Sequence, residues 1–344
     1  MNPFKAASVP EEAGLSSRAL LDYLDALKAS GIEQHSVMVV KNNMLAASMH
    51  FAPHTAHTPH ICYSMSKPFT SIAAGFAVSE GLLALTDRVI DILHDKAPEN
   101  PDPWLSSVTL HHLLCMGSGL VQKSDQIRHV FGDSGNGEDW AQAVLAFGCD
   151  AEPGTTFRYN SHGSYLISCM VQRVAGMNIR DYLMPRLFEP LGIQKPRWDM
   201  SPQGICCGGW GLYLSCEDMA RFGVCLMQGG AWNGRQIIPE AWLKAATQVH
   251  IATDNVPRKP EWAQGYGYHF WRCTGNRFRG DGSEGQYCIV APDQQMVLAA
   301  TAKTEDLVGE FDLFNEYIFN EARQTPAPAD VQQAFAARVK SLSL

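Results

Sequence analysis

The order of strand-like and helix-like segments along the chain limits the folds open to it. Near the N-terminus, SVMVV (36–40) and MLAASMHF (44–51) flank Lys41, Asn42 and Asn43, which predicts a β-hairpin. From about residue 85 to 260 the pattern becomes helical and loop-rich, and strand-like segments then return in NRFRGDG, GQYCIVAP and QQMVLAATAK. A sheet with strands from both chain ends and a helical insertion between them is therefore the economical fold.

This order predicts an α+β protein with two main domains. Residues 1–90 plus 262–324 are expected to form an antiparallel sheet flanked by helices, and residues 91–261 an inserted, mostly helical domain. At 344 residues with 46% hydrophobic residues, the chain is long enough to bury a large core. Residues 325–344 are expected to form a linker, beginning TPAPAD, and a short C-terminal helix.

Charge and hydropathy restrict the class of partner. The net charge of −8, without a cluster of Lys and Arg, argues against nucleic acid or an anionic membrane, so a small-molecule partner is expected. The N-terminus has no apolar stretch of signal-peptide type, and no run reaches the roughly 18 apolar residues of a membrane span. We therefore expect a cytoplasmic protein; the oligomeric state stays open.

A serine and a lysine stand three residues apart in CYSMSKPFTS (62–71), just before an apolar helical run that Gly81 can end. Side chains at i and i+3 share one helix face, so the amine of Lys67 can reach the hydroxyl of Ser64. The helix N-terminus favours an oxyanion at Ser64 and deprotonation of Lys67, and a neutral lysine can act as a base. Because Ser-x-x-Lys also occurs by chance, the pair needs support from other motifs.

The cysteines and histidines give weaker signals. The ten cysteines are scattered without Cys-x-x-Cys, so we expect reduced, mostly core-filling thiols; Cys62 is a rival nucleophile without an evident base. His54, His57 and His60 recur at every third residue as in a metal cluster, but prolines make the segment a loop, which favours a surface or packing role. No H-E-x-x-H or glycine-rich phosphate loop occurs, so we expect no metal and no cofactor.

Four segments together carry a more specific signal: SMSK (64–67), VTLHHLLCMGSGL (108–120), PGTTFRYNSHGSYLIS (153–168) and GGWGLYLSCEDMARFG (208–223). On these segments the chain resembles the serine β-lactamase and penicillin-binding superfamily over about residues 10–320. It is most similar to the class C β-lactamase-related branch of esterases, amidases and D-peptidases.

The resemblance implies roles for three residues. Ser64 would be the acylated nucleophile, Lys67 its base partner, and Tyr159, in the Tyr-x-Asn position of the family, would shuttle the proton. Acyl transfer needs such a set on chemical grounds, because one group attacks, one takes its proton and one returns a proton to the leaving atom. Whether Lys67 or Tyr159 is the acylation base stays open.

The chain departs from the family at two of the substrate-binding positions. Ser161 stands where the family has an Asn that contacts lysine and the substrate amide, and whether Asn160 compensates is open. Gly280-Asp281-Gly282 occupies the position of Lys-Thr-Gly, so the cation that anchors a substrate carboxylate is missing. We expect Asn160, Ser161, Asp281 and Gly282 to contact substrate, and β-lactam turnover to be disfavoured.

The same segment is expected to complete an oxyanion hole. Gly282 would let an edge strand pass close to substrate, and the N–H groups of Ser64 and Ser283 would stabilise the oxyanion. GDGSEG also reads as an ordinary hairpin turn. Trp210, Trp262, Tyr266 and Tyr268 are candidates for a cleft lining, although large aromatics more often pack in the core.

Together these features predict a serine hydrolase that forms an acyl-enzyme on an ester or amide, with no cofactor. A penicillin-binding D-peptidase or β-lactamase is the first alternative. The second is a catalytically silent binding protein of the same fold, which the joint presence of Ser64, Lys67 and Tyr159 disfavours.

Overall fold

The computed structural model describes residues 4–122, 139–257 and 260–344. Residues 1–3, at the start of the predicted sheet domain, and 123–138 and 258–259, within the predicted insertion, lie outside the described residues. Contacts divide the chain into two compact units: residues 1–62, 213–228 and 275–344 form the first, and residues 63–212 and 229–274 the second.

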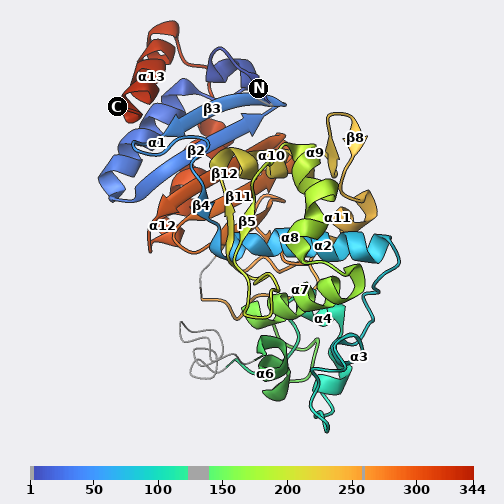
Figure 1. The fold of residues 1–344 in the computed structure, drawn as a ribbon. Coiled ribbons are helices and arrows are strands. Elements are labelled where there is room, and N and C mark those ends of the chain that lie inside the picture. Colours follow the sequence, from blue (N-terminus) through green and yellow to red (C-terminus); the bar gives the residue numbers. More distant parts are fainter. Residues whose placement is uncertain (1–3, 123–138, 258–259) are drawn as a thin grey trace. The chain divides into compact units, whose positions relative to one another are not determined.

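The first unit contains the main sheet and the helices beside it (Figure 1). Its strands are β1 (Lys5–Ala6), β2 (Glu33–Lys41), β3 (Met44–His50), β4 (His60–Ile61), β10 (Phe278–Gly282), β11 (Gln286–Ala291) and β12 (Met296–Lys303), and β6 (Leu212–Leu214) pairs with β4. Its helices are α1 (Ser17–Ser30), α10 (Cys216–Met227), α12 (Leu307–Phe314) and α13 (Ala329–Leu342). Shorter helical turns are η1 (Pro10–Ala13), η5 (Pro292–Gln294), η6 (Asn315–Phe319) and η7 (Glu321–Arg323).

The predicted hairpin and the joining of both chain ends in one sheet are confirmed. The strands lie in the order β1-β3-β2-β12-β11-β10, so β2 from the N-terminal part pairs with β12 from the C-terminal part, Val39 opposite Leu298. Asn42 and Asn43 form the turn between β2 and β3 with φ of 50° and 59°, values that Asn tolerates better than most residues. The fold is α+β as predicted, although β1 pairs with β3 in parallel and the sheet is therefore mixed.

Helices cover both faces of this sheet. Neighbouring residues of a strand point to opposite sides, so adjacent residues of β11 contact different helices. On β11, the Tyr287 ring contacts Phe311 and Phe314 of α12 at centroid distances of 5.6 and 5.9 Å. The next residue, Cys288, faces α10, where its sulfur would lie 2.8 Å from a Cβ added at Gly223. Glycine at position 223 thus lets α10 approach the sheet closely.

The second unit is mostly helical. Its helices are α2 (Ser66–Ser79), α3 (Val89–Ile92), α4 (Leu110–Leu114), α6 (Trp140–Ala146), α7 (Ser161–Ala175), α8 (Ile179–Leu183), α9 (Glu189–Leu191) and α11 (Glu240–Ala246). Shorter turns are η2 (Tyr63–Met65), η3 (Leu105–Ser107) and η4 (Met184–Phe188), and its short strands are β5 (Arg197–Trp198), β7 (Ala231–Trp232), β8 (Arg235–Gln236) and β9 (Trp271–Arg272).

Helix α2 is the central element of the second unit, and α7, α8 and α11 pack on it. It is buried from Ser66 to Ala77, as its nearly all-round apolar sequence predicts, and the chain leaves it near Gly81 at a φ of 72°. The ring of Trp242 on α11 would lie 2.4 Å from a Cβ at Gly75, so this crossing requires a glycine. Phe69 stacks on Phe188 at 5.8 Å on another side of the helix.

These units differ from the predicted division in three segments, the first of which is residues 262–274, with β9, predicted for the sheet unit but part of the second unit. Residues 63–90, which include α2, belong to the helical unit rather than to the sheet unit, because α2 packs against other helices. Helix α10, placed in the insertion by its position in the sequence, belongs to the first unit because it packs on β2, β11 and β12. The position of a helix in the sequence does not reveal which unit it belongs to, because tertiary contacts decide this.

The predicted C-terminal helix forms as α13 and belongs to the first unit, where it packs on α1 and β3. The carbonyl of Leu342 accepts a 2.8 Å hydrogen bond from the Ala52 N–H, and Arg338 lies 3.5 Å from Asp25 of α1. Fourteen residues form α13, so it is a full helix rather than the short one expected. Through α13, the C-terminal end of the chain packs against α1 and β3, which lie near its N-terminal end.

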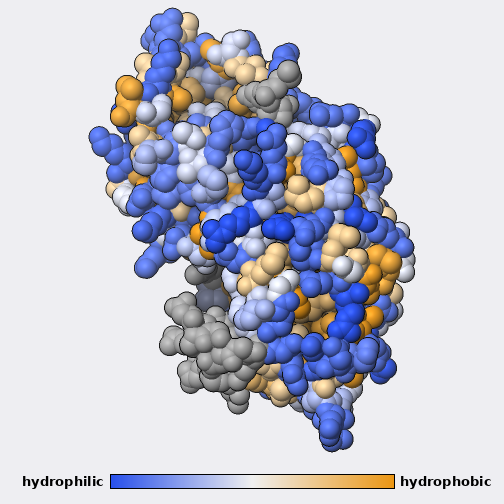
Figure 2. Space-filling model, in the orientation of Figure 1, coloured by the Kyte–Doolittle hydropathy of each residue, from blue (hydrophilic) through white to orange (hydrophobic). Residues whose placement is uncertain are grey.

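The surface carries few large apolar residues among the described ones. Hydrophilic residues cover most of the face shown in Figure 2. Within the described ranges, the exposed large hydrophobic residues are Leu82, Trp104, Met177, Met200, Val249 and Leu344. Among the described residues, every helix is too short or too polar to traverse a bilayer.

Candidate active site

Ser64 and Lys67 meet at the N-terminal end of α2, as their spacing predicts. Ser64 lies in the single turn η2, immediately before α2, and is half-buried, whereas the Lys67 side chain is 1% exposed. The Lys67 Nζ lies 2.9 Å from the Ser64 Oγ. This distance is that of a direct hydrogen bond; the roles of the two residues as nucleophile and base stay predictions.

Hydrogen bonds from Ser66 fix the turn that presents Ser64. The Ser66 hydroxyl donates to the Tyr63 carbonyl at 2.7 Å and accepts from the Leu212 N–H at 3.1 Å. Tyr63 itself has a φ of 45°, a left-handed conformation that is uncommon for a bulky residue. Such conformations are held by the surrounding structure and concentrate at functional sites.

Two further acceptors hold the Lys67 amine. Its Nζ lies 3.0 Å from the Ser161 Oγ, at the start of α7, and 2.9 Å from the Gly209 carbonyl oxygen. With Ser64, these groups surround the nitrogen on three sides, which satisfies the three donors of an ammonium. The amine is therefore fixed in position although its side chain is long and flexible.

The two residues after Tyr159, Asn160 and Ser161, make different contacts. Ser161, flagged as a departure from the family, supplies the oxygen that contacts the lysine. The Asn160 Oδ1 caps α7, because it accepts from the N–H groups of His162 and Gly163 at 2.9 and 3.3 Å. The buried Nδ2 of Asn160 has no hydrogen-bond partner among the described residues. Contact of Asn160 and Ser161 with substrate stays a prediction.

Tyr159 lies beside the Ser64–Lys67 pair in an aromatic cluster. The Lys67 Nζ is 4.5 Å from the centroid of the Tyr159 ring, within the range of a cation–π interaction. The ring stacks on Trp271 at 5.6 Å and an interplanar angle of 14°, and Tyr266 meets it edge-on at 6.2 Å. The structure therefore brings together the three residues predicted for catalysis; the role of Tyr159 in proton transfer stays a prediction.

Sequence reasoning did not single out Gly209 and Trp271. A backbone carbonyl such as that of Gly209 leaves no residue-type signal, and only the surrounding GGWG segment pointed to this region. A Cβ at Gly209 would lie 2.9 Å from the Ser161 carbonyl oxygen, so glycine allows the segment to approach α7. The candidates Trp262, Tyr266 and Tyr268 are buried, at 4%, 1% and 3% exposure, which favours packing roles for them.

Two buried histidines stay neutral near Lys67. Burial, with the lysine charge as second cause, lowers the pKa of His162 to about 4 and that of His269 to about 3. His269 also lies with its Nδ1 2.9 Å from the Leu114 carbonyl, which fixes that nitrogen as the protonated one of a neutral ring.

These lowered pKa values predict loss of stability in acid. Below the ordinary histidine pKa of 6.5, these two histidines are protonated in the unfolded chain but stay neutral in the folded protein. The free energy of unfolding should therefore fall as the pH drops from 6.5 to about 4 for His162 and to about 3 for His269. Each histidine contributes a slope of at most about 1.4 kcal/mol per pH unit. His269→Asn, which tolerates the φ of 64° at this position, should flatten the dependence.

Urea unfolding of wild type and His269→Asn at pH 7.5 and pH 5 measures this difference. The exposed His94, replaced by Asn, controls for the removal of a histidine as such. If the free energy of unfolding fell equally between pH 7.5 and pH 5 in wild type and His269→Asn, the lowered pKa of His269 would be contradicted.

Cys62 is unsuited to act as a nucleophile. The thiol is completely buried, its sulfur lies 3.7 Å from the His60 carbonyl, and burial raises its pKa to about 12. Because the thiolate is the reactive form, the thiol is inert at neutral pH. None of the ten cysteines forms a disulfide, and all except Cys149 are buried, which agrees with the predicted core-filling role.

The segment predicted to bind substrate from the sheet lies at the end of β10 in the first unit. GDGSEG forms the predicted hairpin turn: Gly282 pairs with Gln286 of β11, and Glu284 and Gly285 have φ of 63° and 86°. A Cβ at Gly282 would lie 2.2 Å from the Cys62 carbonyl oxygen, so the glycine is required by close approach of the backbone. The oxyanion-hole role of the Ser283 N–H stays a prediction.

Gly280 lies between the two partners of an ion pair, the buried Arg279 and the half-buried Asp281. The Arg279 side chain is completely buried, and its Nε and Nη2 donate to the Asp281 Oδ2 at 3.1 and 2.9 Å. The guanidinium also lies 5.0 Å from the Phe311 ring centroid. Arg279 is thus the cation nearest in sequence to the Lys-Thr-Gly position. Its side chain is buried in the first unit and paired with Asp281.

A family model described as Beta-lactamase matches residues 22–322. The chain belongs to the Beta-lactamase family. The match spans both units and includes Ser64, Lys67 and Tyr159, which agrees with the resemblance seen in the sequence.

Individual relatives are distant. Penicillin-binding protein 4 of Amycolatopsis lactamdurans is 26% identical over 212 residues, or 52% of this chain and 53% of that protein. The chain spans between 29% and 64% of the length of the curated relatives it matches.

Solved structures confirm the fold. A putative 6-aminohexanoate-dimer hydrolase from Bacillus anthracis has a TM-score of 0.72 and 19% identity, with 87% of this chain and 81% of that chain covered. EstCE1, a hydrolase with promiscuous acyltransferase activity, has a TM-score of 0.68 and 16% identity, with 93% and 99% covered.

Proposed function

We propose that the protein is a serine hydrolase that forms an acyl-enzyme on an ester or amide substrate. The observation that carries the proposal is the 2.9 Å contact between the Lys67 Nζ and the Ser64 Oγ, beside the ring of Tyr159. Membership of the Beta-lactamase family and structural neighbours named as hydrolases support it.

The contacts of Lys67 favour proton transfer from Ser64. The Gly209 carbonyl can only accept, so one N–H of the lysine is directed to it, whereas the hydroxyls of Ser64 and Ser161 can either donate or accept. A neutral amine with N–H groups on Gly209 and Ser161 directs its lone pair towards Ser64. It can then take the proton as the Ser64 oxygen attacks the substrate carbonyl.

Tyr159→Phe tests proton transfer by the Tyr159 hydroxyl separately from the packing of the Tyr159 ring. The variant keeps the ring that stacks on Trp271 and faces Lys67 but lacks the hydroxyl. If the hydroxyl returns the proton to the leaving group, kcat should fall by about 10²- to 10⁴-fold. Steady-state ester hydrolysis and thermal unfolding measure the two effects; unchanged turnover in a folded variant would exclude the shuttle.

The β10 segment favours a substrate without the carboxylate of a penicillin. Position 280 is a buried glycine, and Arg279 cannot take the place of the absent lysine because its guanidinium is buried and paired with Asp281. A substrate anion would therefore lack a charged partner from this strand. If β10 lines the substrate site as the family resemblance implies, we expect an uncharged ester or amide to be preferred over a β-lactam.

Substrate profiling tests the proposal. We expect short-chain nitrophenyl esters or simple amides to be turned over at higher kcat/KM than a chromogenic cephalosporin. Preference for the cephalosporin or a D-peptide would instead support a β-lactamase or penicillin-binding peptidase. Failure of all three classes with folded protein would favour a binding protein that has retained the fold.

A further inference from the structure

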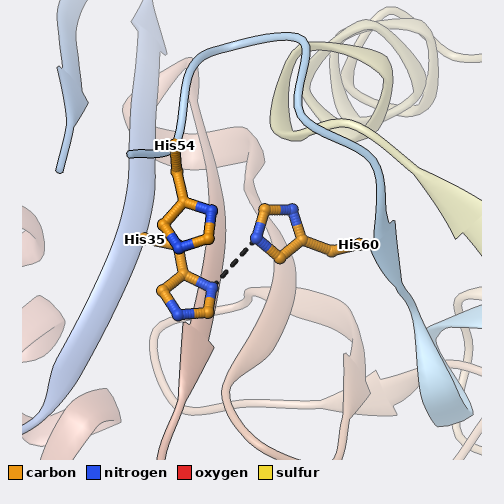
Figure 3. A group of neighbouring side chains, drawn as sticks. All are labelled: His35, His54 and His60. Carbon is orange, nitrogen blue, oxygen red and sulfur yellow. Dashed lines mark hydrogen bonds between the residues drawn. The ribbon is translucent and has the colours of Figure 1, made fainter. Parts of the chain in front are cut away.

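A cluster of three histidines lies in the first unit and is not used by the proposed chemistry. His35 is on β2, His54 is in the loop after β3, and His60 begins β4 (Figure 3). One ring nitrogen of each lies within 4.8 Å of the others. The sequence pattern suggested His54, His57 and His60, but His57 is exposed and its Nδ1 lies 3.3 Å from Glu217.

Contacts outside the cluster indicate which ring nitrogens carry protons. The His60 Nδ1 lies 2.9 Å from the Thr58 carbonyl, which can only accept, so this nitrogen is the protonated one. The His35 Nε2 lies 3.3 Å from the Glu33 Oε1, and a carboxylate accepts in the same way. With both outer nitrogens protonated and both rings neutral, the remaining nitrogens, Nδ1 of His35 and Nε2 of His60, both present lone pairs; in the other neutral tautomer of His35, its Nδ1 donates a hydrogen bond to the His60 Nε2.

These two lone-pair nitrogens face one another at 2.9 Å (Figure 3). Neutral imidazoles repel in this arrangement unless a cation lies between them, either a shared proton or a metal ion. His54 stacks on His35 at a centroid distance of 3.9 Å and brings a third imidazole to the same place.

We propose that His35, His54 and His60 bind a divalent late first-row transition-metal ion such as Zn²⁺. Three imidazoles suit such ions and leave a fourth position for water. Tetrahedral Zn–N bonds of about 2.0–2.1 Å require nitrogens roughly 3.3 Å apart. The separations of 2.9 Å and up to 4.8 Å bracket this value, so small ring movements would complete the site.

The surroundings of the cluster have the features of a metal site. Glu33 and the Thr58 carbonyl receive the outer N–H groups of His35 and His60, the arrangement that orients imidazole ligands in metalloproteins. His35 is buried, whereas His54 and His60 are half-buried, so an ion can enter from solvent. The bound ion would join the loop after β3 to β2. This proposal departs from the expectation, drawn from the sequence alone, of no metal.

Zn²⁺ titration of the metal-stripped full-length protein tests the site. Calorimetry should show one equivalent bound, and His54→Ala and His60→Ala should each weaken binding by more than about tenfold. His57→Ala is the matched control from the same loop and should bind like wild type. Equal affinity in wild type, His54→Ala and His60→Ala would overturn the proposal.

Co²⁺ substitution of the wild-type protein gives a second readout that does not depend on the folding of a variant. We expect the visible absorption of low-coordinate Co²⁺ bound by imidazoles, without the near-ultraviolet band of a Co–thiolate bond. A thiolate band, or the spectrum of hydrated Co²⁺ alone, would show that the histidines form only a hydrogen-bonded cluster.

Discussion

Ser64→Ala is expected to lower kcat for the best ester or amide substrate by on the order of 10⁴-fold or more. The substitution removes the only atom in the proposed mechanism that bonds covalently to the acyl group, and loss of a serine nucleophile has effects of this size in other hydrolases. The free energy of unfolding should fall by about 1–3 kcal/mol, because the substitution removes the Ser64 acceptor from the buried Lys67 amine.

Kinetics of the purified variant, with circular dichroism to verify folding, measure this loss. Ser79→Ala is a matched control, because Ser79 is exposed at the opposite end of α2. It should keep wild-type turnover. If Ser64→Ala retained more than about a tenth of wild-type kcat, a nucleophilic role for Ser64 would be untenable.

Lys67→Met is expected to lower kcat by about 10³-fold, within the range for loss of a general base. Methionine has a similar length but no proton acceptor, so Ser64 would lose its activating neighbour. The variant should fold, because replacing a buried charge by an apolar side chain of similar size is often neutral or stabilising.

Lys67→Arg distinguishes a base from a fixed charge. Arginine keeps the positive charge but does not deprotonate in proteins, so it cannot take the serine proton. Both variants should therefore lose activity. Near-wild-type turnover in Lys67→Arg would show that Lys67 acts through its charge alone and would favour Tyr159 as the base.

The spacing of residues within short segments was sufficient to predict three local features. The hairpin at Asn42 and Asn43, the apolar helix α2 and the Ser64–Lys67 contact all follow from patterns within a few residues. Tyr159 lies far from this pair in sequence, and only the resemblance to a family placed it there. The fold class followed from the order of strands and helices.

Other features depend on contacts that a sequence does not encode by residue type. The Gly209 carbonyl holds Lys67, yet any residue has a carbonyl. Ser161 departs from the Asn of the family, but its hydroxyl reaches the lysine. His35 joins His60 from 25 positions away, whereas regular spacing suggested His57. Long-range packing decided each of these cases.

The central claim, that Ser64 is a nucleophile activated by Lys67, is tested most directly by labelling with a fluorophosphonate probe and locating the adduct by peptide mass spectrometry. We predict one adduct, on Ser64, which is absent in Ser64→Ala and forms much more slowly in Lys67→Met. Folded wild-type protein that stays unlabelled, or that carries the adduct on another residue, would contradict the account.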